Sequence, residues 1–592
     1  MLVLDTEIYR DYFLLSFLQI DTGKVRHFEM HDDCQLDRKS IAAIMRKYTT
    51  ISFNGNNFDL PLIYAALSGM DCAGLKKICD AIIKSKSPAW RIAREYDIAI
   101  PATWDHIDIM EVAPGQSGLK IYGGRLDAPT MQDLPIEPDA SIDPSQRELM
   151  RAYCENDLHT TALLYKRLKP AIDLRASMSE QYGMDLRSKS DAQIAETIIK
   201  SELGKITGKE YRAPGLDDDY GFRYRDPKII SFATDDLREV YRRVRKERFT
   251  LGPNSSVVMP QWLRDNKLRI GKAEYQMGIG GLHSCESAQY FRADDDHVIA
   301  DWDVASYYPS IILQQRLAPE SLGLPFLKVY QSLVAKRLAA KKAGDKVTAE
   351  TLKIAVNGSF GKLGSKYSAL YAPDLLIQTT VTGQLALLML IERLELAGVR
   401  VVSANTDGIV LYHRRDMQPT VDSITWDWML DTSYQLEKTE YLAIASRDVN
   451  NYVAVKLDGK CKGKGVFAPS GLSKNPDMPI IYRAIAEHVA GGKHYAQTIR
   501  DSRDVCEFVS VRRVQGGASW RGGLLGKAVR FYLSNKVPQD ECIHYATNSN
   551  RVPKSAGARP LMTLPKEFPD DIDYEAYTVA AEKLLCEVGY RA

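Results

Sequence analysis

The first 170 residues combine two hydrophobic patterns. Residues 1–20 alternate short apolar runs with polar breaks, which is typical of a hairpin at the edge of a sheet. Apolar residues then recur at helical spacing in 41–48, 60–68 and 144–168. Because strand and helix patterns occur together here, this part of the chain predicts an α/β domain.

The following stretch is less regular. From about 176 to 290 the chain is polar, with a basic run at 241–248 and Gly, Pro and Ser residues at 251–256. We therefore expect connecting structure in this region.

Periodic patterns return later in the chain. Residues 297–304 predict a strand, and 326–342 and 347–358 predict two helices joined by a short polar turn. Two further apolar runs, 399–404 and 408–413, meet at an Asn-Thr-Asp-Gly sequence and predict a β-hairpin.

Composition limits the choice of function. The chain has 592 residues, which is too many for one hydrophobic core, so roughly three to five packed units are expected. Its 78 Lys and Arg against 76 Asp and Glu exclude a uniformly basic surface, so nucleic-acid binding would depend on local clusters. The nine cysteines form no Cys-x2-Cys pair, which argues against a zinc ribbon or a disulfide framework and favours a reducing compartment.

The sequence gives no indication of a membrane. The N-terminal residues lack the basic leader and apolar run of a signal peptide, so we expect no export. The longest apolar stretch, 377–391, is shorter than the ~20 residues of a membrane span and predicts a buried helix. A cytoplasmic protein is therefore expected.

A first group of carboxylates lies in the N-terminal region. Asp5 and Glu7 are two apart in an apolar strand, so both face the same side and repel each other unless a cation lies between them. Asp59 follows a Gly- and Asn-rich turn that opens a helix, and Tyr153 and Asp157 share one helical face. Taken singly, each of these patterns is more often an ordinary solvated surface.

The order of these motifs carries more information. Asp-Thr-Glu, then Asn-x3-Phe-Asp, then Tyr-x3-Asp resembles the three motifs of the DEDDy 3'→5' proofreading exonuclease domain. The resemblance implies that two divalent ions are held by Asp5, Glu7, Asp59 and Asp157. It assigns Tyr153 to orienting the attacking water, and Asn54 and Phe58 to the single-stranded 3' end. Two ions and several carboxylates suffice for such hydrolysis without a protein nucleophile.

A second group begins in the strand 297–304. Asp303 stands near the end of this strand, and Asp301 is a rival metal ligand because period 2 puts it on the same face. Asp-x2-Ser-x-Tyr-Pro-Ser resembles motif A of family B DNA polymerases. The resemblance assigns Asp303 and Val304 to metal binding and Tyr307 and Tyr308 to the nucleotide. The ring of Tyr308 would exclude a 2'-hydroxyl.

The two helices that follow carry polar residues in stripes. These residues are Arg337 and Lys341 at i and i+4, and Lys353, Asn357 and Phe360 at i, i+4 and i+7. Such cations suit a triphosphate, although a basic solvated hairpin is the alternative interpretation. Lys-x3-Asn-Gly-Ser-Phe-Gly resembles motif B, with Gly358 in place of Ser and Phe360 in place of Tyr. We expect both changes to be mild.

Motif C departs from the family. Two aspartates around Thr are usual, whereas Asn405 occupies the first position here and Asp407 the second. In the family the second aspartate bridges the metal ions with the motif A residue, so we expect activity with an altered metal environment. An ordinary Asp-Gly hairpin turn is the alternative.

Further segments resemble parts that contact DNA. Tyr452 matches the Lys-x-Tyr primer grip, with Asn450 where Lys is usual, so its charge is expected from Lys462 or Lys464. Gly280 and Gly281 lie in a segment similar to the Gly-rich connection between exonuclease and polymerase halves, where backbone can approach DNA. The basic segments 511–532 and 552–565 resemble the thumb of bacteriophage B-type polymerases.

Six motifs thus occur in the order of one family, which predicts a bacteriophage-like family B DNA polymerase with a DEDDy exonuclease. The implied fold is multidomain α/β and α+β, with an RNase H-like exonuclease domain and a right-hand palm, fingers and thumb. The expected domains are exonuclease 1–175, connecting segment and start of the palm 176–290, palm 291–325, fingers 326–372, palm 373–470 and thumb 471–592.

The resemblance also sets the expected reaction and partners. A primer 3'-OH would attack the α-phosphorus of a dNTP, with two Mg2+ ions, or Mn2+, in each site. Expected partners are primer–template DNA, a single-stranded 3' end, and a processivity factor, helicase or single-strand-binding protein. We expect a monomer in the host cytoplasm.

The priming mode and the polymerase activity leave alternatives. The short spacing between motifs A, B and C leaves no room for the insertions of protein-primed relatives, so a nucleic-acid primer is expected. A protein-primed polymerase, an exonuclease with an inactive polymerase half and a non-catalytic DNA-binding protein remain alternatives.

Overall fold

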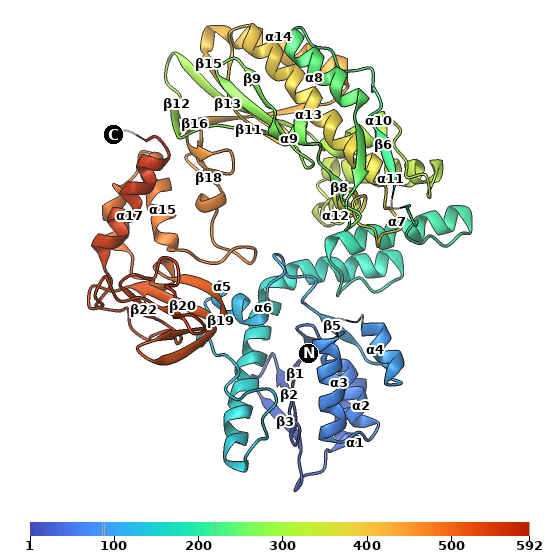
Figure 1. Cartoon of the computed structure of the whole chain (residues 1–592), viewed down its shortest axis with the longest axis vertical. Coiled ribbons are helices and arrows are strands. Elements are labelled where there is room, and N and C mark those ends of the chain that lie inside the picture. The colour runs from blue at the N-terminus through green and yellow to red at the C-terminus, as the bar shows by residue number, and fades with distance from the viewer. Residues whose placement is uncertain (86, 88, 218, 591–592) are drawn as a thin grey trace. The chain divides into compact units, whose positions relative to one another are not determined.

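The computed structural model describes residues 1–85, 87, 89–217 and 219–590, which form two compact units (Figure 1). Unit 1 comprises residues 1–190, 470–480 and 502–577; unit 2 comprises residues 191–469, 481–501 and 578–592. The boundary runs through two helices, α15 (Pro479–Val489) and α17 (Tyr574–Glu587). The basic segments that resemble a thumb thus group with the N-terminal residues, and the assignment of palm, fingers and thumb stays a prediction.

Unit 1 contains a five-stranded sheet in the order β3-β2-β1-β4-β5. β1 (Leu2–Ile8), β2 (Phe13–Gln19) and β3 (Val25–Met30) are antiparallel, whereas β4 (Thr50–Ser52) and β5 (His106–Asp108) add to β1 in parallel. β1 and β2 confirm the hairpin predicted over residues 1–20, but its expected place at the edge of the sheet is wrong, because β1 is the central strand.

Helices cover both faces of this sheet. They are α1 (Arg38–Lys47), α2 (Asp59–Leu67), α3 (Cys72–Lys84), α4 (Ala89–Glu95), α5 (Leu119–Arg125) and α6 (Arg147–Tyr182). Along β1, Leu2 and Leu4 pack with residues of α1 to α3, whereas Val3 packs with residues of α6. Period 2 therefore directs Asp5 and Glu7, which share the face of Val3, toward α6. α1, α2 and α6 confirm the three predicted helical stretches.

A second sheet of unit 1 has the order β21-β19-β20-β22. Its strands are β19 (Ser510–Trp520), β20 (Gly523–Leu533), β21 (His544–Tyr545) and β22 (Ala558–Pro560). Arg530 is fully buried between this sheet and the N-terminal region. Its guanidinium donates to the carbonyls of Ala128 and Leu561, each at 2.9 Å.

Unit 2 contains a ten-stranded antiparallel sheet in the order β18-β17-β16-β13-β15-β14-β11-β10-β9, with β12 also paired to β16. Its strands are β9 (Lys267–Ile270), β10 (Ala273–Met277), β11 (Leu282–Ser284), β12 (Gln289–Arg292), β13 (His297–Val304), β14 (Arg400–Asn405), β15 (Gly408–Arg414), β16 (Leu436–Asp448), β17 (Asn451–Lys456) and β18 (Cys461–Lys464). β13 and the β14–β15 hairpin confirm the strands predicted there.

The helices of unit 2 include a long apolar one. They are α7 (Asp191–Thr207), α8 (Asp235–Lys246), α9 (Gln261–Asp265), α10 (Tyr307–Gln314), α11 (Leu324–Ala343), α12 (Lys346–Lys362), α13 (Pro373–Leu396), α14 (Gln418–Thr432) and α16 (Tyr495–Asp501). α11 and α12 confirm the predicted helical pair.

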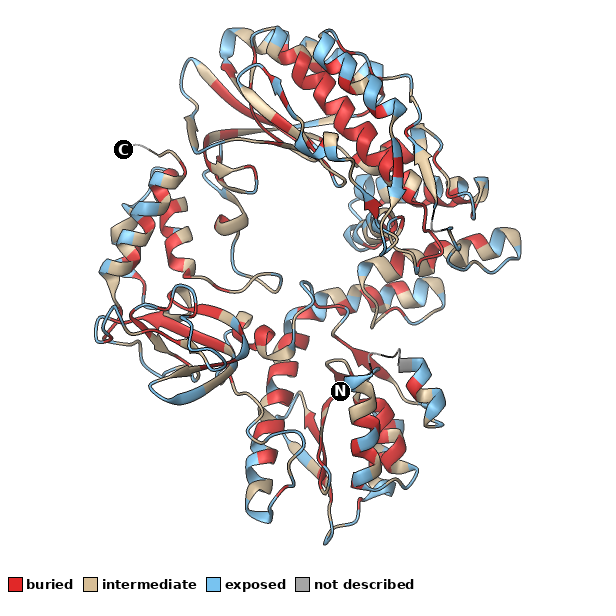
Figure 2. Ribbon diagram, viewed as in Figure 1, coloured by how far each residue is buried: buried red, intermediate tan, exposed pale blue. Residues whose placement is uncertain are grey.

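α13 is longer than the sequence indicated. Its 24 residues make it the one helix among the described residues with the length and mean hydropathy, 1.5, of a membrane span, but 89% of that window is buried inside the protein. Figure 2 shows α13 as buried along most of its length. The predicted buried helix is therefore present, although 377–391 covers only its centre.

The region 176–290 differs from the expectation of irregular structure. α7 and α8 lie within it, and a three-stranded sheet is formed by β6 (Gly221–Arg223), β7 (Arg248–Leu251) and β8 (Val257–Val258). Most of the basic run, 241–246, belongs to α8, and Arg248 begins β7. The buried Leu237, Val240 and Val244 of α8 have helical spacing but are hidden among charged residues in the sequence.

Candidate active sites

The carboxylates of unit 1 come together from three elements. Asp5 and Glu7 lie on β1, Asp59 is the first residue of α2, and Asp157 lies on α6. Ligand atoms of Asp5, Glu7 and Cys154 all lie within 4.8 Å of one another, and Thr6 donates to Asp59 at 2.7 Å. The structure thus collects residues separated by more than a hundred positions in the sequence.

Electrostatics in this cluster disfavour ionisation. Burial raises the pKa of Asp5 well above its usual value, and the charges of Glu7, Asp59 and Asp157 add to this. Burial likewise raises the pKa of Asp59 to about 7. A divalent cation would relieve this repulsion, and oxygen donors are those that Mg2+ prefers.

Lys120 was not identified from the sequence. Its ammonium group donates to the carboxylate of Asp157 and lies 4.2 Å from the centre of the Tyr153 ring. It opposes the rise of the pKa of Asp157, which burial causes. Lys120 belongs to the short helix α5, and no spacing to the other residues marks it in the sequence.

The turn before α2 is fixed by a further acid. Asn54 has a positive φ of 70°, and its backbone N–H donates to Asp108 at 2.9 Å. Gly55 is required here because a Cβ would lie 1.8 Å from the Ser52 hydroxyl. Phe58 precedes α2 and packs against the hydrophobic core, partly buried. Asn54 and Phe58 therefore lie in the turn that leads into Asp59, and their predicted contact with a 3' end stays a prediction.

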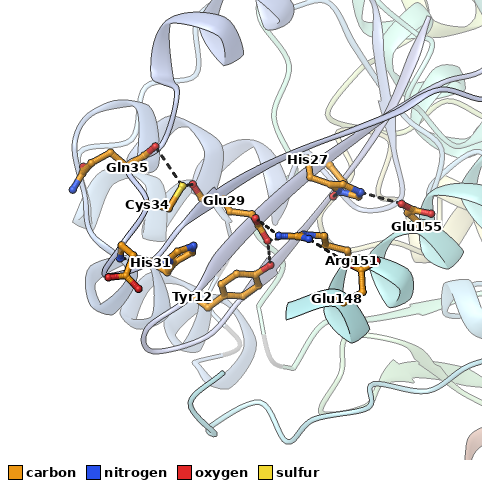
Figure 3. A network of polar contacts seen from close by, with 11 residues as sticks. Tyr12, His27, Glu29, His31, Cys34, Gln35, Glu148, Arg151 and Glu155 are labelled. Carbon is orange, nitrogen blue, oxygen red and sulfur yellow. Dashed lines mark hydrogen bonds and ion pairs between the residues drawn. The ribbon is translucent and has the colours of Figure 1, made fainter. Parts of the chain in front are cut away.

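A polar network holds α6 against the sheet (Figure 3). Arg151 of α6 donates to both carboxylate oxygens of Glu29, at 3.0 and 2.7 Å, and Tyr12 donates to the same carboxylate. Burial works against ionisation of Glu29, but these hydrogen bonds outweigh it and lower its pKa. His27 and Glu155 are joined at 2.9 Å. The network fixes the helix that carries Tyr153 and Asp157.

In unit 2, Asp303 and Asp407 are brought together by the sheet. Asp303 of β13 is paired with Gly408, the residue after Asp407, and the N–H of Val304 donates to the carbonyl of Asp407 at 2.7 Å. A Cβ at Gly408 would lie 2.2 Å from the Asp303 carboxylate, so only glycine leaves room for it.

Both carboxylates line a cavity of about 330 Å³. The other lining residues are Asp301, Ser403, Asn405, Thr406, Gly408, Val410, Ile444, Tyr452, Lys462 and Lys464. Burial raises the pKa of Asp303 to about 6, with Asp301 adding to the effect and Lys462 opposing it. Burial also raises the pKa of Asp407. Tyr452, Lys462 and Lys464 thus share a cavity with the motif A and motif C aspartates.

The rival ligand Asp301 is occupied by protein partners. It is 5% exposed, and one of its oxygens accepts from Tyr441 at 2.6 Å and from Lys462 at 3.1 Å. Burial would lower the pKa of Lys462, but Asp301 outweighs it and raises this pKa. Asp301 therefore anchors Lys462, which leaves Asp303 as the freer carboxylate of this strand.

Hydrogen bonds to neighbouring segments hold the turn that carries Asn405 and Asp407. The Asn405 side-chain N–H donates to the carbonyl of Val449 at 3.0 Å, which a carboxylate could not do. Glu286, not identified from the sequence, accepts hydroxyl hydrogen bonds from Ser284 (2.5 Å), Ser446 (2.8 Å) and Ser403 (3.3 Å). These hydroxyls join three strands next to the turn.

The expected nucleotide residues differ in exposure. The Tyr308 ring stacks on Phe360, with 4.2 Å between ring centres. Tyr307, in contrast, is 4% exposed and donates to the carbonyl of Gly383 at 2.6 Å. The Tyr307 side chain is thus enclosed by the protein, and its predicted contact with the nucleotide stays a prediction.

The cations of α11 and α12 are spread along an accessible surface. Arg337 lies 3.3 Å from the hydroxyl of Ser306, beside motif A. Lys341 faces Glu437 at 3.8 Å, and Lys353 faces Glu350 at 3.2 Å. Asn357 is exposed on the same helix as Lys353. Their predicted contact with a triphosphate stays a prediction.

Gly358 of motif B has a packing reason that the sequence did not indicate, while the expectation that this change is mild stays a prediction. A Cβ there would lie 2.7 Å from the carbonyl oxygen of Asp191 and 3.0 Å from Ala195. α7 therefore packs against α12 at a distance that excludes the serine usual in the family. The sequence could not indicate this, because α7 lies in the region expected to be irregular.

The glycine pair 280–281 lies against the motif C turn. The carbonyl of Gly280 accepts a hydrogen bond from the Tyr308 hydroxyl, and a Cβ at Gly281 would lie 2.9 Å from Thr406. The loop thus borders both Tyr308 and the turn that carries Asp407. Contact of its backbone with DNA stays a prediction.

The chain resembles known proteins in its fold and not in its sequence. No protein-family model matches the chain, and no curated protein matches it in sequence. Among solved structures, the chain is similar to the family B DNA polymerase from the hyperthermophilic archaeon Pyrobaculum calidifontis, with 13% sequence identity and a TM-score of 0.41. The likeness covers 100% of this chain and 78% of that one.

Proposed function

We propose that this protein is a template-directed DNA polymerase that extends a primer 3'-OH with dNTPs and removes nucleotides by a 3'→5' exonuclease. The arrangement of Asp303 beside Asp407, over Gly408 and at the wall of a cavity, carries this proposal. Residues 104 positions apart are held together there by backbone pairing, as a shared metal site requires.

The donor sets of both sites fit divalent ions. Asp303 and Asp407 would hold them in unit 2, with the Val304 carbonyl, and Asp5, Glu7, Asp59 and Asp157 would hold them in unit 1. When bound, such ions would supply Lewis-acid stabilisation of the phosphoryl charge and lower the pKa of the attacking hydroxyl or water. Mg2+ is the proposed ion, with Mn2+ as a substitute.

The chain's own residues would position the polymerase substrates. Arg337, Lys341 and Lys353 would bind the triphosphate, Arg as a bidentate donor and Lys as point charges. Tyr308 would lie under the sugar and exclude a 2'-hydroxyl. Lys462 and Lys464 would contact the primer backbone, and base pairing with the template would supply sequence information.

In unit 1, Tyr153 would orient the water that attacks the terminal phosphodiester. Lys120 holds the carboxylate of Asp157 and packs over the Tyr153 ring, so it would fix both groups. Asn54 and Phe58 lie in the turn that precedes Asp59 and would hold the last bases of a single strand. The network around Arg151 and Glu29 holds α6, the helix that carries Tyr153 and Asp157, in place.

One observation favours a second candidate function. Asn405 replaces an acidic residue of motif C, so the protein could be an exonuclease whose polymerase half is inactive. We favour the polymerase because the Asn405 amide has a structural partner in the carbonyl of Val449, while Asp303 and Asp407 remain available. The proposed primer is a nucleic acid, and the proposed location is the cytoplasm.

Primer extension and 3' degradation, measured on one labelled primer–template, test the proposal. Asp303→Ala and Asp407→Ala should abolish extension and leave degradation of single-stranded DNA intact. Asp5→Ala should show the reverse pattern. Absence of dNTP incorporation by Asp5→Ala, which cannot remove what it adds, would exclude the polymerase and leave the exonuclease candidate.

A further inference from the structure

The core helix α13 anchors the two tyrosines of motif A at neighbouring residues. Tyr307 donates to the carbonyl of Gly383 at 2.6 Å, and a Cβ at Gly383 would lie only 3.2 Å from the Tyr307 ring. The next residue, Gln384, is 1% exposed and reaches the loop 278–281 between β10 and β11. α13 therefore contacts both Tyr307 and this loop, which in turn binds Tyr308.

The side chain of Gln384 binds this loop in two directions. Its Oε1 accepts from the N–H of Gly278, and its Nε2 donates to the carbonyl of Gly278, each at 2.8 Å. The N–H of Gly278 also closes the loop by donating to the carbonyl of Gly281 at 3.1 Å. A buried amide that pairs with both the N–H and the C=O of one residue holds two successive peptide groups and so fixes the path of the backbone.

The far side of the same loop holds Tyr308. The carbonyl of Gly280 accepts the hydrogen bond of the Tyr308 hydroxyl. Burial raises the pKa of Tyr308 to about 12, so the hydroxyl stays a donor at neutral pH. The ring is held on its face by Phe360. Gln384 thus acts on Tyr308 through the loop, without touching it.

We propose that Gln384 is a positioning residue for sugar selection, because it fixes the loop whose Gly280 carbonyl holds the Tyr308 hydroxyl. The inference rests on the proposed polymerase function, in which Tyr308 excludes ribonucleotides. A steric filter discriminates only while its atoms stay in place, and the hydrogen bond to Gly280 fixes the hydroxyl end of the ring, which the stacking contacts with Phe360 and Tyr307 do not hold.

The chain supplies a matched control on the same helix. Gln378 is 4% exposed and makes an equivalent pair of bonds with Arg225, whose N–H donates to Oε1 at 2.9 Å and whose carbonyl accepts from Nε2 at 2.7 Å. Methionine has a similar volume and forms neither bond. Gln378→Met should therefore cost similar stability without disturbing the loop 278–281.

The test compares insertion of a dNTP and the matching rNTP opposite one template base, as the ratio of the two kcat/KM values. Gln384→Met and Tyr308→Phe should each lower this ratio about 3- to 10-fold, the range of one hydrogen bond. Gln378→Met should leave it unchanged. The double variant Gln384→Met/Tyr308→Phe should discriminate no worse than the weaker single variant, because both changes remove one connection.

Three outcomes would overturn the inference. They are an unchanged ratio in Tyr308→Phe, an equal ratio in Gln384→Met and Gln378→Met, or multiplied effects in the double variant. Tyr308→Phe leaves the core intact, so the test stands even if Gln384→Met fails to fold. If the wild-type protein inserts no dNTP, the proposed function fails as well; normal insertion with an unchanged ratio refutes only the role of Gln384.

Discussion

The two carboxylate sites differ in how they are exposed to water. In unit 1, Asp59 and Asp157 are 2% and 7% exposed, Asp5 and Glu7 are partly buried, and Lys120 lies among the acids. In unit 2, Asp407 is exposed and Asp303 partly buried, at the wall of an open cavity. An enclosed cluster cannot use water to screen its charges, so it depends more strongly on cations.

The two sites also use their lysines differently. Lys120 donates to a proposed metal ligand, Asp157, whereas Lys462 donates to Asp301, which stands beside the proposed ligand Asp303. Lys120 thus lies within the carboxylate cluster of unit 1, and Lys462 is anchored beside the aspartate pair of unit 2. A site that receives a single strand can be enclosed in this way, while one that must admit a duplex and a nucleotide has to stay open.

Removal of Lys120 should have the largest effect. Lys120→Met takes away the donor to Asp157 and the cation over the Tyr153 ring, so both groups lose their fixed positions. We expect 3' degradation to fall about 100-fold, as misplacement of reacting groups by roughly 1 Å typically does. The measurement is the single-turnover rate on single-stranded DNA, with primer extension as the control activity. An unchanged rate would mean that Lys120 is only a structural partner.

Removal of Lys462 should act on stability as well as synthesis. Lys462→Met leaves the carboxylate of Asp301, which is 5% exposed, with Tyr441 as its remaining donor. Because Lys462 is itself partly exposed, the expected loss is about 2 kcal/mol, below that of a fully buried pair. Denaturant unfolding checks this. Asp301→Asn added to Lys462→Met should recover part of the loss; simple additivity would refute the pairing.

Without metal, the two sites should contribute differently to the pH dependence of the melting temperature. Folding raises the pKa of Asp59 from near 4 to about 7, so the native state binds this proton more tightly than the unfolded chain does. The contribution of protonated Asp59 to the free energy of unfolding is therefore fully present below pH 4 and is lost as the pH rises through about 7. In EDTA, the melting temperature should therefore fall by several degrees between pH 5 and pH 8, and Mg2+ should restore it. Asp59→Asn should flatten this dependence more than Asp303→Asn, because the pKa of Asp303 is raised only to about 6. Equal flattening by the two variants would contradict the difference in enclosure.

Local patterns were sufficient to place many elements. The strand expected at 297–304 is β13, with the same bounds, and the hairpin around Asp407 is β14–β15. Alternation along a strand and the Asp-Gly turn are signals within a few residues, and pairing of these strands then brings Asp303 to Asp407. The order of motifs, rather than any single spacing, identified the carboxylates.

Contacts between distant segments were not predictable in the same way. Glu286 meets Ser403 and Ser446, which are 117 and 160 residues away. Gly358 is explained only by α7, whose apolar positions were masked by polar neighbours in 176–290. A single buried carboxylate or glycine has no periodicity, so its partners appear only once the elements have packed.

The smallest effect is expected at Asn405, which stands where the motif C of family B polymerases, which this segment resembles, has an aspartate. Asn405→Asp restores the usual acid but removes the amide that donates to the carbonyl of Val449 at 3.0 Å, and it sets a carboxylate against that oxygen. We expect a stability loss of about 1 kcal/mol and no gain in synthesis, since Asp407 and Asp303 already form the pair that the reaction needs. Unfolding midpoints and primer extension on the same preparation check both parts. A tenfold or larger gain in synthesis would show that Asn405 impairs the unit 2 site and would contradict the expectation that Asp303 and Asp407 suffice.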